Sequence, residues 1–140
     1  MTDIRVTFAA RAGSIGAALF HDACALTLKG ERVRAASISF IIVNDRDIAR
    51  INRKFLRHFG ATDVISFPMD EGPPLEAEVY ISIDTARSHA REYNVPLREE
   101  CARLAIHGTL HCCGYDDNDD ADRNRMVKRQ ETYVRRLFGI

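Results

Sequence analysis

Two histidines in an otherwise apolar stretch are the residues of this chain best suited to catalysis. His107 and His111 are four residues apart, so a helix with 3.6 residues per turn places both imidazoles on one face. Gly114 can end that helix, and the chain can then turn back and bring Asp117 toward the same face. Two imidazoles and a carboxylate, with the fourth position open, form the donor set of a catalytic zinc site. We therefore predict one zinc ion per chain, bound by these three side chains.

Core packing is the alternative explanation for the histidines. A single histidine in an apolar helix is usually a core residue, but two on one face require two buried partners for their ring nitrogens. The glycine and the carboxylate that follow favour the metal. Cys112 and Cys113 point away from the His111 face, so we assign both to core packing.

Length and composition indicate one domain, which we take as residues 1–140. The 20 basic and 20 acidic side chains cancel, so any nucleic-acid binding must come from a local patch. The four cysteines form no CxxC motif and lie among apolar residues, which is typical of reduced thiols in the cytoplasm. The N-terminal residues lack the layout of a signal peptide, and no apolar run approaches membrane-spanning length, so we expect no membrane partner.

Hydrophobic periodicity predicts strands and helices that alternate along the chain. Strands are expected at residues 4–8, 37–43, 62–67 and 79–83, and the continuously apolar second one should be central in the sheet. Helices are expected to begin at Ser14, Asn44, Asp84, Pro96 and Asp119. The predicted class is α+β, a layered α/β domain with a small mixed four-stranded sheet and about five helices.

A basic stripe marks the second predicted helix. Arg50, Lys54 and Arg57 follow i, i+4, i+7 spacing, and no acidic residue lies between Ile48 and Gly60. Such a stripe is either a solvated helix face or a set of contacts to nucleic-acid phosphates.

The order His-x-x-x-His-x-x-Gly-x-x-Asp matches the extended zinc motif of metzincin proteases, with aspartate as the third ligand. Three protein ligands leave a zinc-bound water whose pKa falls to about 7, which supplies a nucleophile for hydrolysis. Metzincins carry a glutamate base directly after the first histidine, where this chain has Gly108, which we expect to leave space at the metal. Without that base, a phosphodiester is a better substrate than a peptide, because its leaving group is better and zinc with arginine stabilises its negative charge.

The segment from His107 to Asp117, HGTLHCCGYDD, resembles the signature of the YbeY-type endoribonucleases, bacterial rRNA maturation factors whose pattern is close to HGxLHLxGYDH. Ile51-Asn52 followed by TDVISFP at residues 62–68 is similar to the family's LN…TDVLSFP segment. The strand EVYIS at residues 78–82 lies where the family has its GDI-type strand. The resemblance covers roughly residues 40–135, with the three blocks in the family's order.

This resemblance implies a zinc-dependent endoribonuclease that is specific for single-stranded RNA. It implies a cytoplasmic role in late rRNA processing, including 16S rRNA 3′ end maturation, and in quality control with the ribosome, where a ribosomal protein is the candidate protein partner. The family's third ligand is a histidine where this chain has Asp117, whose carboxylate also binds zinc but makes it a weaker Lewis acid. The arginine that family members often carry between the first two blocks would fall on Leu56, so Arg57 is the candidate catalytic residue. Ala77 stands where the family favours glycine.

Three functions stay open at this point. The first is the endoribonuclease, in which Arg50, Lys54 and Arg57 bind the RNA. The second is a metzincin-like metalloprotease, and the third is a ribosome-associated factor whose zinc is purely structural. An open coordination position separates the two enzymes from the structural site, and cleavage of RNA or of casein separates the nuclease from the protease.

Overall fold

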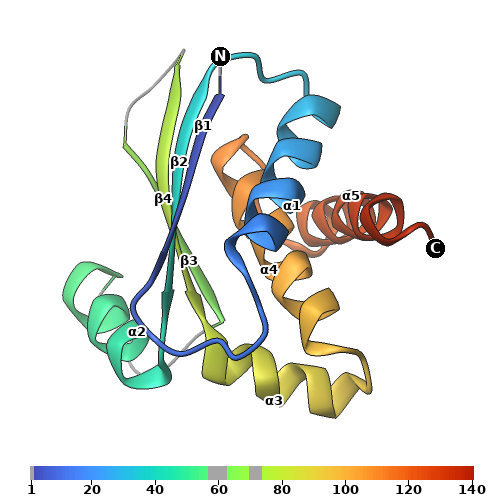
Figure 1. Cartoon of the computed structure of the whole chain (residues 1–140). Coiled ribbons are helices and arrows are strands. Elements are labelled where there is room, and N and C mark those ends of the chain that lie inside the picture. Colours follow the sequence, from blue (N-terminus) through green and yellow to red (C-terminus); the bar gives the residue numbers. More distant parts are fainter. Residues whose placement is uncertain (1, 57–62, 70–73) are drawn as a thin grey trace.

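The computed structural model describes residues 2–56, 63–69 and 74–140, and they form a mixed sheet with helices on both faces (Figure 1). The strand order is β1-β2-β4-β3, in which β1, β2 and β4 are parallel and β3 is antiparallel to β4. The strands are β1 (Thr2–Phe8), β2 (Ala36–Val43), β3 (Val64–Pro68) and β4 (Leu75–Ser82).

Five α-helices complete the described part of the chain, so the predicted α+β class is confirmed. They are α1 (Ala17–Gly30), α2 (Asp45–Ile51), α3 (Ile83–Tyr93), α4 (Leu97–Cys112) and α5 (Asp120–Phe138), and a π-helical segment η1 (Asn52–Leu56) continues α2. Helices α1 and α4 cover one face of the sheet, α5 packs against both of them, and α2 lies on the opposite face (Figure 1). Among the described residues, none of these helices combines the length and apolar character that a membrane span requires.

Strand β2 is central because both of its faces are buried. Ile38, Phe40 and Ile42 belong to the main core beneath α1 and α4. Ile41 and Val43 point to the other face and pack in the smaller cluster under α2. A strand that is covered on both faces reads as a continuous apolar run, which is why its position was predictable.

Two predicted helix starts are confirmed by side-chain caps. The Asn44 side chain accepts a hydrogen bond from the Asp47 N–H at 2.8 Å, and the Asp119 carboxylate accepts one from the Asp122 N–H at 2.7 Å. Each bond satisfies a backbone donor that the first helical turn leaves without an intrahelical partner.

Three other predicted starts were wrong. Ser14 lies outside α1, which begins after Gly16 without a side-chain cap. Ser82 caps α3 in place of Asp84, whose carboxylate instead accepts a hydrogen bond from the first residue of α2. Pro96 is the residue before α4 and not its first residue.

Two strand boundaries differ from the prediction because of pairing between strands. β4 begins at Leu75, before the predicted start at residue 79, because Leu75 pairs with Ala36 at the first residue of β2. Pro68 was expected to end the third strand but belongs to it, opposite Ala77. An edge strand tolerates proline because one side of its backbone has no ladder partner. The first predicted residue of this strand, residue 62, lies outside the described residues.

Helix α4 lies unusually close to the sheet at Gly108. A Cβ at this position would be 2.6 Å from Val79 Cγ1 and 3.3 Å from Ser66 Oγ. The Ser66 hydroxyl donates a hydrogen bond to the Gly108 carbonyl oxygen at 3.2 Å. We expected this glycine to leave space at the metal, but its missing side chain faces β3 and β4. The glycine therefore permits close packing between helix and sheet.

We expect Gly108→Ala to destabilise the fold by about 1–3 kcal/mol, although alanine is the better helix former, because the new methyl group overpacks the contact with Val79. Urea denaturation measures this. Val79→Ala should relieve the clash, so the double variant should lose less stability than the sum of the two single variants. A Gly108→Ala variant as stable as the parent would show that the contact is not tight.

Candidate metal centre

The structure brings His107, His111 and Asp117 together. One ligand atom from each lies within 4.8 Å of the other two, and His111 Nε2 is 3.7 Å from Asp117 Oδ2. A tetrahedral zinc with bonds near 2 Å separates its ligand atoms by about 3.3 Å, so small rotations of these side chains would form the site. Both imidazoles are half-buried, whereas the side chain of Asp117 is 46% exposed. The group is therefore open to solvent on the carboxylate side.

The end of α4 turns the chain back toward the histidines. Gly114 has a φ of +103°, and its N–H donates to the His111 carbonyl oxygen at 3.0 Å. The Tyr115 N–H donates to the Leu110 carbonyl oxygen at 3.1 Å, which completes a Schellman motif. The predicted stop at Gly114 is confirmed, and this reversal places Asp117 beside the helix face that carries both imidazoles.

A hydrogen-bond chain fixes the orientation of the His107 ring. Arg103 donates to both carboxylate oxygens of Glu131, at 2.9 and 3.0 Å. Gln130 donates its amide N–H to Glu131 Oε2 at 3.0 Å, which directs the amide oxygen toward His107. That oxygen lies 2.7 Å from Nδ1, so Nδ1 carries the proton and Nε2 keeps its lone pair. A metal-binding histidine needs this tautomer when Nε2 is the ligand atom.

Arg103, which is half-buried, is the last donor in this chain of hydrogen bonds. Its guanidinium also donates to Glu100 at 2.9 Å and to Glu99 at 3.1 Å. Burial opposes its charge, but the hydrogen bonds with Glu131 and Glu100 hold the pKa of Arg103 above its ordinary value. The guanidinium is thus permanently charged, and Glu131 is held as an acceptor for Gln130.

The environment of His111 favours its neutral form. Burial lowers the pKa of His111, and the neighbouring His107 lowers it further, against the raising effect of Asp117 and of a backbone hydrogen bond with Tyr115. The neutral imidazole is the form that binds a metal ion, so less proton release accompanies binding.

A cavity of about 470 Å³ opens beside the three side chains. His107 and Asp117 line it together with Tyr93 of α3, Arg123 of α5 and Asp63, which precedes β3. The Arg123 guanidinium lies 3.5 Å from the Asp117 carbonyl oxygen and pairs with Asp120 at 2.9 Å. A cation at the rim of a metal centre suits an anionic substrate.

Gln130 was missed by sequence reasoning, although the sequence contains a signal for it. It is one helical turn after Met126 on the buried face of α5, together with Tyr133 and Val134. A polar residue on an apolar helix face needs a buried partner, and here that partner is the ring of His107. Arg123 was also missed, since nothing in the sequence relates it to the turn before α5.

Two of the three residues of the predicted basic stripe, Arg50 and Lys54, lie in the described part of the chain. Arg50 on α2 is exposed and pairs with Asp47 at 3.7 Å, Lys54 in η1 is exposed, and Arg57 lies outside the described residues. The predicted spacing assumed a continuous α-helix, whereas a π-helical turn follows Ile51. Arg50 and Lys54 are not among the described residues that line the cavity beside the imidazoles.

Fold and site together define the class of this protein. An α+β sheet supports a helix that carries two imidazoles, and the following turn adds a carboxylate, which is the donor set of hydrolytic metal centres. The model of the family described as "Endoribonuclease YbeY" matches residues 14–138, and the chain belongs to this family. The resemblance drawn from the sequence is thereby confirmed, over a longer segment than expected.

Curated relatives and a solved structure agree with this assignment. The chain is 39% identical over 121 residues to a protein of Chlorobium luteolum named "Endoribonuclease YbeY", covering 86% of this chain and 88% of that protein. A protein of the same name from Chlorobaculum parvum is 40% identical over 126 residues, covering 90% and 89%. The solution structure of a Thermotoga maritima protein superimposes with a TM-score of 0.65 at 26% identity, over 99% of this chain and 90% of the other.

We expect Gln130→Leu to weaken zinc binding by about 10- to 100-fold, because it leaves the His107 Nδ1–H without its acceptor and frees the ring to rotate. Competition with a chromophoric chelator measures the affinity. Asn124→Leu makes the same chemical change at an exposed position of α5 and serves as the control. Equal affinities in the two variants would contradict a role for Gln130 in orienting the imidazole.

Proposed function

We propose that this protein is a zinc-dependent endoribonuclease that cleaves single-stranded RNA. The observation that carries the proposal is the His107, His111 and Asp117 group in a member of the YbeY endoribonuclease family. The cellular role that fits such an enzyme is late rRNA processing in the cytoplasm, including 16S rRNA 3′ end maturation and ribosome quality control. A ribosomal protein is the proposed protein partner, and residues 1–140 act as one catalytic domain.

The donor set fits a single zinc ion. His107 would bind through Nε2, because its Nδ1 is engaged by Gln130, and His111 Nε2 faces the Asp117 carboxylate. These are the three candidate ligands within the described residues. A bound zinc ion would lower the pKa of a water molecule at the open position and stabilise negative charge on a phosphodiester.

The side chains of the protein orient one candidate metal ligand and place a positive charge near the site. The hydrogen-bond chain from Arg103 through Glu131 and Gln130 holds the first imidazole in place before any substrate arrives. Arg123 at the cavity rim gives a positive charge within reach of a phosphate. Arg57 remains our candidate for direct stabilisation of the transition state.

The packing of Gly108 argues against a protease. A metzincin places its glutamate base directly after the first histidine, and here that position is pressed against Val79 and Ser66. A glutamate could not be accommodated there without moving α4 away from the sheet. A structural zinc is disfavoured by the exposure of Asp117, which leaves the site accessible to water.

The decisive experiment compares two adjacent aspartates. We expect Asp117→Ala to lose zinc and to slow cleavage of single-stranded RNA by more than about 100-fold, the upper range for losing a supporting hydrogen bond. Asp116→Ala is the matched control and should stay near the parent, while Asp117→His should retain zinc and activity. Zinc content by atomic absorption and cleavage of a labelled RNA, with and without chelator, give the readouts. Casein cleavage, chelator-resistant RNA cleavage or the reverse order of the two aspartates would overturn the proposal.

We propose that Arg50, Lys54 and Arg57 hold RNA by its phosphates. Helix α2 is across the sheet from α4, and β3 is the edge strand that RNA would pass to reach both faces (Figure 1). Contacts of this kind weaken as salt rises, because phosphate neutralisation releases counterions.

Replacing all three basic residues by glutamine should raise the Kd for single-stranded RNA and reduce the log–log salt slope by about 0.7 for each lost contact. Zinc content should not change. Arg57→Gln alone should also slow cleavage at saturating RNA if this arginine stabilises the transition state. A triple variant with the salt slope of the parent would show that the stripe is only a solvated face.

A further inference from the structure

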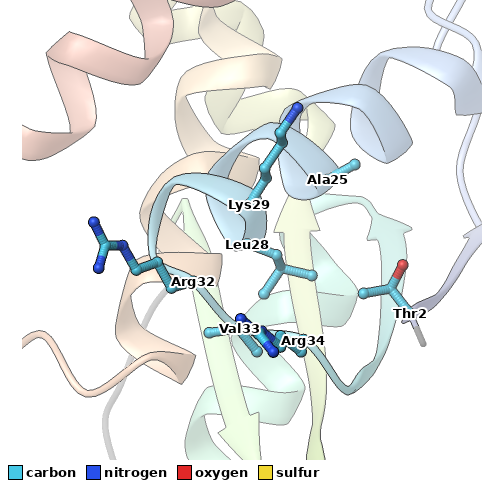
Figure 2. Close-up of a pocket in the computed structure, with 7 residues that line it drawn as sticks. All are labelled: Thr2, Ala25, Leu28, Lys29, Arg32, Val33 and Arg34. Carbon is cyan, nitrogen blue, oxygen red and sulfur yellow. The ribbon is translucent and has the colours of Figure 1, made fainter.

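A second basic surface lies at the end of α1. A cavity of about 530 Å³ is lined by the cations Lys29, Arg32 and Arg34 and by the apolar side chains of Leu28 and Val33. Lys29 and Arg32 extend in different directions, and Leu28 and Val33 lie below Lys29 in this view (Figure 2). No acidic residue lines this cavity within the described part of the chain.

The charges of Lys29 and Arg32 are not neutralised by the described neighbours. Among the described residues, no acidic group lies within ion-pair distance of Lys29 or Arg32. Glu31 lies between them in the sequence, but its carboxylate accepts hydrogen bonds from Tyr133 and, at 2.7 Å, from Arg129. Its charge is therefore matched on the α5 side, and the two cations remain available.

Arg32 occupies a backbone position that is unfavourable for arginine. It has a φ of +61°, its N–H donates to the Lys29 carbonyl oxygen at 3.1 Å, and the Val33 N–H donates to the Leu28 carbonyl oxygen at 2.9 Å. These bonds form a Schellman motif with Arg32 at the left-handed position, which glycine or asparagine normally fills.

The other helix ends with a positive φ follow that preference. They use Gly114, Gly139 and Asn94, so among the described helix ends Arg32 is the exception. A side chain kept where the backbone disfavours it indicates a use for that side chain.

The surface continues to the C-terminal end of α4. An adjacent cavity of about 480 Å³ is lined by Arg32 and Arg34 and also by Cys112 and Cys113. These cysteines directly follow His111, so the basic surface reaches the end of the helix that carries the imidazoles.

We propose that Lys29 and Arg32 form a second phosphate-binding site for the RNA strand whose cleavage occurs at the metal centre. The inference rests on the proposed RNA substrate. Ammonium and guanidinium groups match phosphodiester oxygens, and the apolar floor formed by Leu28 and Val33 accepts the face of an unpaired base. A strand held at both places is anchored outside the scissile bond, which adds affinity for long RNA without adding to the chemical step.

The test uses single-stranded RNA that is 2′-O-methylated to prevent cleavage, zinc-loaded protein, and fluorescence anisotropy at several salt concentrations. With an RNA of about 16 nucleotides, Arg32→Gly should weaken binding several-fold and reduce the log–log salt slope by about 0.7. An RNA of about 4 nucleotides is too short to span both sites, so Arg32→Gly should weaken its binding less than that of the longer RNA. Arg91→Gln removes an exposed arginine from α3, at the opposite end of the molecule, and should leave both unchanged (Figure 1).

Arg32→Gly should also raise Tm by about 3 °C, because glycine suits the left-handed position. Better folding combined with weaker binding excludes unfolding as the cause of the loss. Arg32→Asn, which tolerates the same backbone, is the second variant and should show the same change in slope. An unchanged slope in both Arg32 variants, or an equal change in Arg91→Gln, would overturn the proposal. Because this RNA is not cleaved, the experiment measures binding alone. Its outcome can therefore be distinguished from a failure of the parent protein to cleave RNA.

Discussion

The contact between α4 and the sheet at Gly108 is the constraint on which the site depends. Without a Cβ at this position, the helix lies directly against Val79 and Ser66. The side of α4 that faces the sheet is thereby fixed. The helical period then sets the directions of His107, one residue before Gly108, and of His111, three residues after it. A wider separation would loosen the helix and allow it to rotate, and the His107 ring would then turn away from its partner Gln130 on α5. The rigidity of the site thus begins with a residue that has no side chain.

A series of hydrogen bonds from Arg103 to His107 determines which nitrogen of the His107 ring carries the proton. Helical packing decides where the His107 ring lies, but it does not decide which nitrogen carries the proton. That choice follows from Arg103, which can only donate, and from Glu131, which as a carboxylate can only accept. The amide of Gln130 must then turn its oxygen to the ring. The tautomer of the candidate ligand is therefore set three side chains away, by an arginine that can act only as a donor.

Contacts between residues close in the sequence could be predicted, whereas contacts between residues far apart in the sequence could not. His107, His111 and Asp117 are within one helix and its terminal turn, so local geometry was sufficient to bring them together. Gln130 is 23 residues from His107 and contacts it only because α4 and α5 pack side by side. Strand order, the true start of β4 and the direction of Gly108 likewise depend on which elements meet in space. The class of the fold was predictable because burial of both faces of β2 is visible in its composition.

The position of β1 determines which part of this molecule opens first. Within the described residues β1 pairs with β2 alone, and most of its residues are exposed, whereas β2 and β4 are hydrogen-bonded on both sides. Amide hydrogens of β1 should therefore exchange with solvent through local fraying, while those of β2 and β4 exchange only when the core unfolds. Two strands separate β1 from β3, the neighbour of α4 at the other edge. The N-terminal edge can thus open and close many times while the imidazoles keep their places.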